Sequence, residues 1–235
     1  MKLKKYIWLV LGFALWSCNS PSLQSKNFNN SYSKASVSIL EIVGRVNTAE
    51  LFKICLQNKV LKSNIYQWND HVAIYNNFPI QQLLIDQLKL KFPGTQFKVY
   101  DGPFYRFERS ASCNNKDTAK EWNNILLTAN LVADPKMQQE YLDYHKTQFE
   151  KWPEVSNGFC NASFQQLLVF KNGRQLMLVI SIPKGKTLDE LNPLTTKNNP
   201  RVDDWNKLMS KYQEGLPGTK RGETWVFLKP LGSLQ

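Results

Sequence analysis

The stretch FQQLLVFKNGRQLMLVISI, residues Phe164–Ile182, has a strand–turn–strand pattern. Two apolar runs, Phe164–Phe170 and Gln175–Ile182, flank the triplet Lys171-Asn172-Gly173. Short runs rich in Leu, Val and Ile that are bounded by turn residues predict β-strands. The Asn-Gly pair supplies the positive φ angles that a tight hairpin turn requires. The sequence therefore predicts an antiparallel hairpin here.

The segments on either side of the hairpin alternate between strand and helix patterns. A strand is predicted at Ile125–Leu131, and Asp134-Pro135 then opens a helix, with Pro at a position that the first turn tolerates. After the hairpin and a long polar loop, a helix is predicted from about Arg201 to Glu214 and a strand at Thr224–Leu228. The order βαββαβ is that of a ferredoxin-like unit.

The first half of the chain shows the same order of elements. It comprises a strand at Val37–Val43, a helix from Asn47 or Thr48 to about Val60, a hairpin of Ile65–Trp68 and His71–Tyr75, a helix from Pro79 to Phe92, and a strand at Gln96–Tyr100 extended by Phe104–Phe107.

We therefore expect an α+β protein with two tandem ferredoxin-like (βαββαβ) units, a degenerate one at residues 36–110 and a second at 120–235. A single unit of this kind leaves one face of its sheet apolar. Two units packed sheet to sheet would form an intramolecular dimeric α/β-barrel, a pseudo-dimer within one chain. Pairing between two chains as a homodimer stays open at this point.

The N-terminus has the pattern of a targeting segment. The basic stretch Met1–Lys5 precedes the apolar run Tyr6–Trp16, which is too short for a permanent membrane span. The sequence Leu15-Trp16-Ser17-Cys18 resembles the lipobox of bacterial lipoproteins. We expect residues 1–18 to be a lipoprotein signal peptide, with Cys18 lipidated, the alternative being an ordinary secretory peptide. Residues 19–35 read as a flexible tether, so the protein would be lipid-anchored in the cell envelope, facing the periplasm or on the outer membrane.

Charge and cysteine usage exclude several kinds of partner. The chain has 30 Lys and Arg against 19 Asp and Glu, but the lysines are dispersed and form no basic stripe, so no nucleic-acid partner is expected. With Cys18 lipidated, Cys55, Cys113 and Cys160 remain, and their spacing suggests no metal site. One disulfide is allowed but not required, and Cys55 reads as a small core residue.

The helix opened by Asp134-Pro135 carries the most suggestive pair of side chains. Tyr141 and His145 are four residues apart, so they lie above one another on one helix face, and Gln148 and Trp152 continue that face. A phenol and an imidazole on an apolar face suggest a site that binds a polyol and moves a proton. A hydrogen-bonded core pair is the alternative reading, and His71, in the first half, reads as structural or exposed.

Four segments together resemble the L-rhamnose mutarotase family, over about Ile125–Leu231. They are Tyr141-xxx-His145, Trp152-Pro153-Glu154-Val155, the hairpin strand Leu176–Ile180, and Val202–Met209. Members of this family are α+β barrel dimers that interconvert the anomers of L-rhamnose or related sugars without a metal or organic cofactor. The resemblance thus implies a monosaccharide ligand and no cofactor.

The resemblance also implies roles for individual residues. His145 would be the proton donor, Tyr141 would bind the sugar, and Trp205 would form part of an aromatic wall. Asn206 stands where many members have a second Trp, and Gln165 stands close to the position of a sugar-binding Tyr, so we expect both to contact the substrate. The His145-to-Trp152 spacing is three residues longer than is usual in the family. The first half has no Tyr-x-x-x-His pattern in its first helix, so one site per chain is expected.

These observations predict a sugar mutarotase that opens and recloses the ring by acid/base catalysis. Mutarotation needs one group that takes a proton from the anomeric hydroxyl and one that supplies a proton to the ring oxygen, and an imidazole suits either task. The second group is not evident in the sequence. Two other functions stay open: a non-catalytic saccharide-binding or structural lipoprotein that retains the fold, and a haem or small-aromatic oxygenase.

Overall fold

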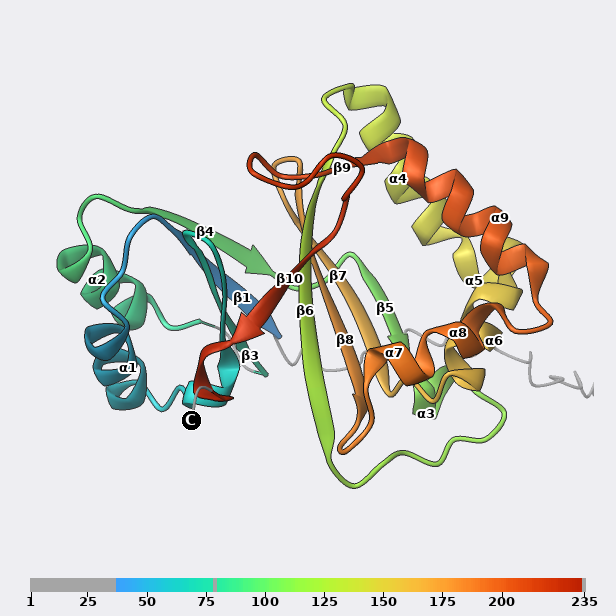
Figure 1. Cartoon of the computed structure of the whole chain (residues 1–235), viewed down its shortest axis with the longest axis horizontal. Helices are drawn as coiled ribbons and strands as arrows, with labels where there is room; N and C mark the ends of the chain where they lie inside the picture. The colour runs from blue at the N-terminus through green and yellow to red at the C-terminus, as the bar shows by residue number, and fades with distance from the viewer. Residues whose placement is uncertain (1–36, 78–79, 234–235) are drawn as a thin grey trace, which may run out of the picture. The chain divides into compact units, whose positions relative to one another are not determined.

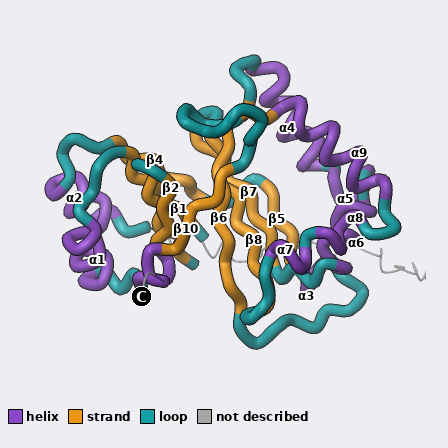
Figure 2. Tube along the Cα trace, viewed as in Figure 1, coloured by secondary structure: helices purple, strands orange, loops and turns teal. Residues whose placement is uncertain are grey.

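The computed structural model describes residues 37–77 and 80–233. The predicted signal peptide (1–18), its Cys18 and the tether (19–35) lie outside these residues. Within the described ranges, no helix is long and apolar enough to cross a membrane. The chain folds into helices and antiparallel strands (Figures 1 and 2), which confirms the expected mixed class.

The predicted hairpin forms, and it lies within the sheet of the second half. The strands of this half are β6 (Trp122–Leu131), β7 (Gln166–Asn172), β8 (Gln175–Pro183) and β10 (Val226–Pro230). Their order across the sheet is β10-β6-β8-β7, and all neighbours are antiparallel. The turn closes with Asn172 opposite Gln175, and Gly173 has the positive φ of 58° that the sequence called for.

The strands of the first half have the equivalent order. They are β1 (Ser38–Val43), β2 (Ile65–Trp68), β3 (His71–Asn76) and β4 (Gln96–Asp101), arranged β4-β1-β3-β2. Strand β2 pairs with β10 through Gln67 and Tyr66, so the strands of the two halves belong to one continuous sheet.

Helices cover one face of each half of the sheet (Figure 1). Asn47 caps α1 by accepting a hydrogen bond from the backbone N–H of Glu50, and Asp134 caps α4 through Lys136 and Met137. The helices are α1 (Thr48–Gln57), α2 (Gln82–Lys91), α3 (Arg109–Ser112), α4 (Pro135–Lys146), α5 (Gln148–Lys151), α6 (Pro153–Asn161), α7 (Leu188–Leu191), α8 (Pro193–Thr196) and α9 (Pro200–Met209).

Three clusters of buried apolar side chains hold these layers together. One packs α1 and α2 against the first-half strands, and a second packs the helices of the second half against β6, β7 and β8. The third joins the opposite faces of the two sets of strands, with Ile39, Tyr75 and Tyr100 packed in one cluster with Phe170 and Met177. Burial of both faces of each set of strands therefore occurs within a single chain.

Strand β5 (Tyr105–Glu108) corrects one prediction. The segment Phe104–Phe107 was expected to extend β4, but β5 instead pairs with β7 at the far edge of the sheet. The break occurs at Gly102-Pro103, where Gly102 has a φ of 78° and Pro103 cannot donate a ladder hydrogen bond. The segment that leaves the first half therefore completes the sheet of the second.

Two helices are shorter than predicted. Helix α4 ends at Lys146, because Thr147 leaves the helical region with φ −105° and ψ 8°, so Gln148 and Trp152 are not on its face. Trp152 precedes Pro153 and is also non-helical. Helix α9 ends at Met209, and the residues after it form a 3₁₀ turn and the short strand β9 (Gln213–Glu214), which pairs with β6.

A disulfide joins Cys113 to Cys160, with their Cα atoms 5.7 Å apart. It ties the segment after α3 to the end of α6. Arg109 Nη1 reinforces this connection by donating to the carbonyl of Cys160 at 2.9 Å. Cys55 is free and fully buried, as the sequence predicted for a small core residue.

One fully buried carboxylate links the two halves. Glu41, on β1, accepts hydrogen bonds from His71 Nδ1 (2.7 Å), Tyr100 Oη (2.9 Å) and Gln175 Nε2 (2.8 Å), and Lys98 Nζ lies 3.7 Å away. Burial raises the pKa of Glu41, but the His71 bond and the Lys98 charge outweigh it, so the pKa lies below its ordinary value. His71 is thus structural, as one reading of the sequence held.

We predict that Glu41→Ala lowers the free energy of unfolding by about 3 kcal/mol, because it leaves buried partners on both halves without their acceptor. Urea unfolding at neutral pH measures the change. Glu121→Ala is the matched control, since Glu121 pairs with Lys184 in an exposed ion pair, and it should leave the unfolding midpoint unchanged. Equal effects of the two substitutions would contradict this role of Glu41.

Candidate active site

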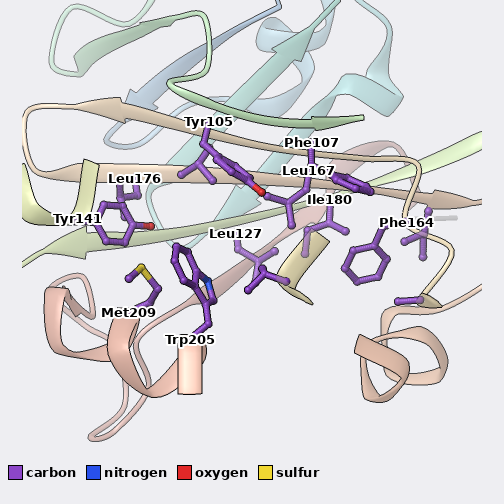
Figure 3. Close-up of a cluster of buried hydrophobic side chains, with 14 of the residues drawn as sticks. Tyr105, Phe107, Leu127, Tyr141, Phe164, Leu167, Leu176, Ile180, Trp205 and Met209 are labelled. Carbon is purple, nitrogen blue, oxygen red and sulfur yellow. The ribbon is translucent and has the colours of Figure 1, made fainter. Parts of the chain in front are cut away.

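Tyr141 and His145 line a cavity of about 400 Å³ between the helices and strands of the second half. Its wall comprises side chains from α4, α6 and α9 on one side and from β5, β7 and β8 on the other. Figure 3 shows Trp205 and Met209 rising from α9 toward the strands, with Tyr141 and Tyr105 beyond them. The cavity has the size of a small-molecule site.

The imidazole of His145 is buried and held in one orientation. Its exposed fraction is 8%, and Nδ1 lies 2.9 Å from the carbonyl oxygen of Tyr141, one helical turn earlier. A carbonyl oxygen can only accept a hydrogen bond, so Nδ1 must carry the proton. Among the described residues, Nε2 has no protein partner. In the neutral ring this nitrogen therefore offers a lone pair to a ligand.

Burial keeps this ring neutral. Desolvation lowers the pKa of His145 to about 4, although the hydrogen bond to the Tyr141 carbonyl acts in the opposite direction. At neutral pH, His145 is therefore a proton acceptor before it can be a donor. This refines the expectation from the resemblance, in which His145 acts as the donor.

Aromatic rings surround His145 on several sides. The centroid distances from its ring are 4.2 Å to Tyr141, 5.1 Å to Tyr105, 5.3 Å to Trp205 and 5.7 Å to Phe104. Trp205 in turn contacts Trp152 edge-on at 5.6 Å. Such an aromatic wall suits the apolar C–H face of a sugar ring.

The hydroxyl of Tyr141 is held by a short relay of hydrogen bonds. Gln213 Nε2 donates to Tyr141 Oη at 3.1 Å, and Trp225 Nε1 donates to Gln213 Oε1, also at 3.1 Å. Burial raises the pKa of Tyr141, so its phenol stays protonated. Tyr141 and His145 are thus not bonded to one another through their side chains, as the core-pair reading would require.

The structure brings four of the predicted residues to the cavity and leaves one outside. His145, Tyr141, Trp205 and Asn206 all line it. Gln165 does not: its side chain accepts from the backbone N–H of Ala119 and donates to the carbonyl of Ser163. Its amide thus bonds to the segments before β6 and β7, and its side chain does not line the cavity.

Several residues at the cavity were not among the predicted site residues. Tyr105 comes from β5, outside the segment that carries the resemblance, and donates from its hydroxyl to Gln148 Oε1 at 2.6 Å. The alternation of Tyr105 and Phe107 with Arg106 and Glu108 is a strand signal that could have separated β5 from β4. Gln213 was predicted to lie in a helix, and nothing in the sequence indicated that its side-chain amide would bond to Tyr141 and Trp225.

A second hollow, of about 450 Å³, lies against the same histidine. Tyr105 and His145 line both spaces, so these two side chains form part of the wall that the spaces share. The exposed rings of Phe104 and Phe149 flank the second hollow together with Arg106 and Lys146. This outer hollow is charged, whereas the inner cavity is not.

The inner cavity holds no formal charge. None of the described residues that line it is Asp, Glu, Lys or Arg. The nearby carboxylates of Asp143, Asp203 and Asp204 are exposed and outside this lining. Across the described part of the chain, no group of three or more His, Cys, Asp or Glu is placed to bind a metal ion. The cavity thus suits an uncharged ligand.

Sequence comparison connects this half of the chain to sugar mutarotases. Residues 124–231 match the sequence model of the L-rhamnose mutarotase family. An L-fucose mutarotase from Xanthomonas campestris pv. campestris is 29% identical over 96 residues, which cover 40% of this chain and 74% of the relative. The matched family segment contains α4, α9 and the predicted hairpin. The second half is therefore similar to carbohydrate isomerases of this family.

Comparison with solved structures gives weaker likenesses over most of the chain. A putative monooxygenase from Lactobacillus acidophilus NCFM has a TM-score of 0.43 and 7% identity, covering 82% of this chain and 91% of its own. A putative monooxygenase from Fusobacterium nucleatum has a TM-score of 0.40 and 11% identity, covering 83% and 93% respectively. At these TM-scores the likeness carries no conclusion about fold or activity.

We predict that the buried neutral His145 makes the protein less stable in acid. Its pKa is 6.5 when unfolded and about 4 when folded, so between these values the unfolded state binds more protons. The free energy of unfolding should therefore fall by roughly 3 kcal/mol as the pH drops from above 6.5 through 4. Urea unfolding at several pH values measures it. His145→Asn should lack this component, and an identical pH dependence in both proteins would contradict the prediction.

Proposed function

We propose that the chain is a sugar mutarotase, which interconverts the α and β anomers of L-rhamnose, L-fucose or a related deoxysugar. The observation that carries this proposal is the free Nε2 of a neutral His145 at an uncharged, aromatic cavity. The family match over residues 124–231 supports the same reaction class.

The cavity matches the chemistry of a neutral sugar. Trp205 and Tyr105 offer apolar faces to the C–H side of a pyranose ring, while Tyr141 and Asn206 offer polar groups to its hydroxyls. A sugar carrying a carboxylate or phosphate would place an unpaired charge in this lining, at a high desolvation cost. A 6-deoxysugar carries a methyl group in place of a hydroxymethyl group, and the apolar wall can accommodate it.

His145 moves the proton in this proposal. Its Nε2 takes the proton of the anomeric hydroxyl, which becomes a carbonyl as the ring opens, and returns it when the ring recloses on the other face. The hydrogen bond from Nδ1 to the Tyr141 carbonyl keeps Nε2 free for this step. The proposal needs no metal or organic cofactor.

The proposal extends to the architecture of the chain and to its location in the cell. The equivalent strand orders of the two halves and their shared apolar cluster support an intramolecular α/β-barrel of two tandem ferredoxin-like units. The Cys113–Cys160 disulfide is typical of an oxidising compartment outside the cytoplasm. It therefore supports the proposal of a lipoprotein anchored through Cys18 in the cell envelope.

We predict that the purified full chain speeds anomer exchange of L-rhamnose or L-fucose, measured by saturation-transfer NMR. His145→Asn keeps a donor for the Tyr141 carbonyl but lacks the second ring nitrogen, so the exchange rate should fall by about 10²–10⁴-fold. His71→Asn, at the other histidine of the chain, is the matched control and should leave the rate unchanged.

If the wild-type protein gave no more than the spontaneous exchange rate with each of a panel of deoxysugars, the proposed mutarotase activity would be wrong. If calorimetry then showed saccharide binding that His145→Asn leaves intact, a non-catalytic saccharide-binding protein would take its place. A visible absorption band of bound haem would instead favour an oxygenase.

A further inference from the structure

We propose that Tyr141 is the second proton-transfer group, which protonates the ring oxygen of the sugar, and that Gln213 and Trp225 are positioning residues that aim its proton into the cavity. This inference rests on the proposed function and deepens it. The sequence and the resemblance give Tyr141 only a binding role and leave the partner of His145 unidentified.

The direction of the two hydrogen bonds that link Trp225, Gln213 and Tyr141 follows from the indole of Trp225, which can only donate. The indole Nε1 of Trp225 is a donor and never an acceptor. The atom of Gln213 that faces it at 3.1 Å is therefore the amide oxygen, and the amide nitrogen faces Tyr141. The hydrogen bond from Trp225 therefore distinguishes the oxygen of the Gln213 amide from its nitrogen, which the shape of the amide group alone does not.

The amide nitrogen of Gln213 can only donate, so Tyr141 Oη accepts this hydrogen bond and keeps its own proton free. Tyr141 is 1% exposed, and the described residues offer no acceptor for that proton. Because Tyr141 lines the cavity, a ligand oxygen is the partner that remains. A buried hydroxyl without an acceptor is unfavourable, which gives the site an intrinsic preference for a ligand that accepts.

The fold places this relay independently of α4. Gln213 belongs to β9 and lies opposite Leu131 at the end of β6, while Trp225 directly precedes β10, which also pairs with β6. Both positioning residues are thus attached to the same long strand. Tyr141 itself stands one helical turn before His145, with the two ring centroids 4.2 Å apart. The two side chains thus line one cavity as neighbours, as proton transfers to two oxygens bonded to the same carbon require.

The reaction balances with these two residues alone. His145 Nε2 takes the proton of the anomeric hydroxyl, the bond between the anomeric carbon and the ring oxygen breaks, and the electron pair moves to the ring oxygen. That oxygen takes the proton of Tyr141, which leaves an imidazolium beside a phenolate. After the carbonyl rotates, the reverse transfers close the ring on its other face and restore both residues.

Gln213→Glu tests this assignment with little change in size. At pH 7.5 the introduced carboxylate accepts from Trp225 Nε1 and also from Tyr141 Oη, which turns the tyrosine proton away from the substrate. We expect kcat for anomer exchange to fall by about 10²-fold or more, while sugar affinity by calorimetry changes little. At pH 5.5 roughly 6% of a carboxyl group with the ordinary glutamate pKa of about 4.3 is protonated and can donate to Tyr141 again, so kcat should rise several-fold above its value at pH 7.5.

Two further variants complete the experiment. Tyr141→Phe removes the donor and should lose activity at every pH, without the recovery in acid. Gln57→Glu adds the same charge on the exposed end of α1, away from the cavity, and should match the wild type. The wild-type rate should be flat between pH 7.5 and 5.5.

The possible outcomes separate this inference from the proposed function. A wild type without exchange activity overturns both. An active wild type with unimpaired Tyr141→Phe, or a loss in Gln213→Glu that is the same at every pH, overturns the role of Tyr141 alone and leaves His145 as the single shuttle.

Discussion

The hydrogen bond from His145 Nδ1 to the carbonyl of Tyr141 is the constraint on which the site depends. Because the carbonyl can only accept, this bond decides which ring nitrogen carries the proton. Burial then keeps the ring neutral by lowering its pKa to about 4. The same logic applies at Trp225, whose indole can only donate and so decides the direction of both bonds in the relay to Tyr141. The Tyr141 carbonyl, which can only accept, thus orients the imidazole of His145, and the Trp225 indole, which can only donate, orients the amide of Gln213.

The remainder of the fold serves to bring these groups together. Strand β6 is the common support, since it pairs with β8, β9 and β10 and so links the hairpin to the positioning residues. Strand β5 closes the sheet edge and carries Tyr105 to the ring of His145. The first half of the chain packs against the other face of this sheet. It also bonds to the second half through Glu41 and Gln175. Tyr105, which lines the cavity, likewise comes from outside the segment that resembles mutarotases.

Local chemistry made much of this arrangement predictable from the sequence. The Asn172-Gly173 turn, the Asp134 cap of α4 and the four-residue spacing of Tyr141 and His145 each follow from a rule about neighbouring residues, and each forms as expected. The failures concern partners far apart in the chain. The pairing of β5 with β7 rather than β4, the role of Gln213, and the loop contacts of Gln165 depend on tertiary packing, on which spacing carries no information. The disulfide between Cys113 and Cys160 was likewise allowed by the sequence but not specified by it.

The protonation state of His145 can be measured directly in solution. ¹⁵N NMR of the imidazole nitrogens distinguishes the two tautomers and the cation, and the His71→Asn variant leaves a single histidine to assign. We predict a protonated Nδ1 and an unprotonated Nε2 at pH 7, with no change between pH 8 and 5.5. A proton on Nε2 at pH 7, or a ring that titrates near its ordinary pKa of 6.5, would contradict it.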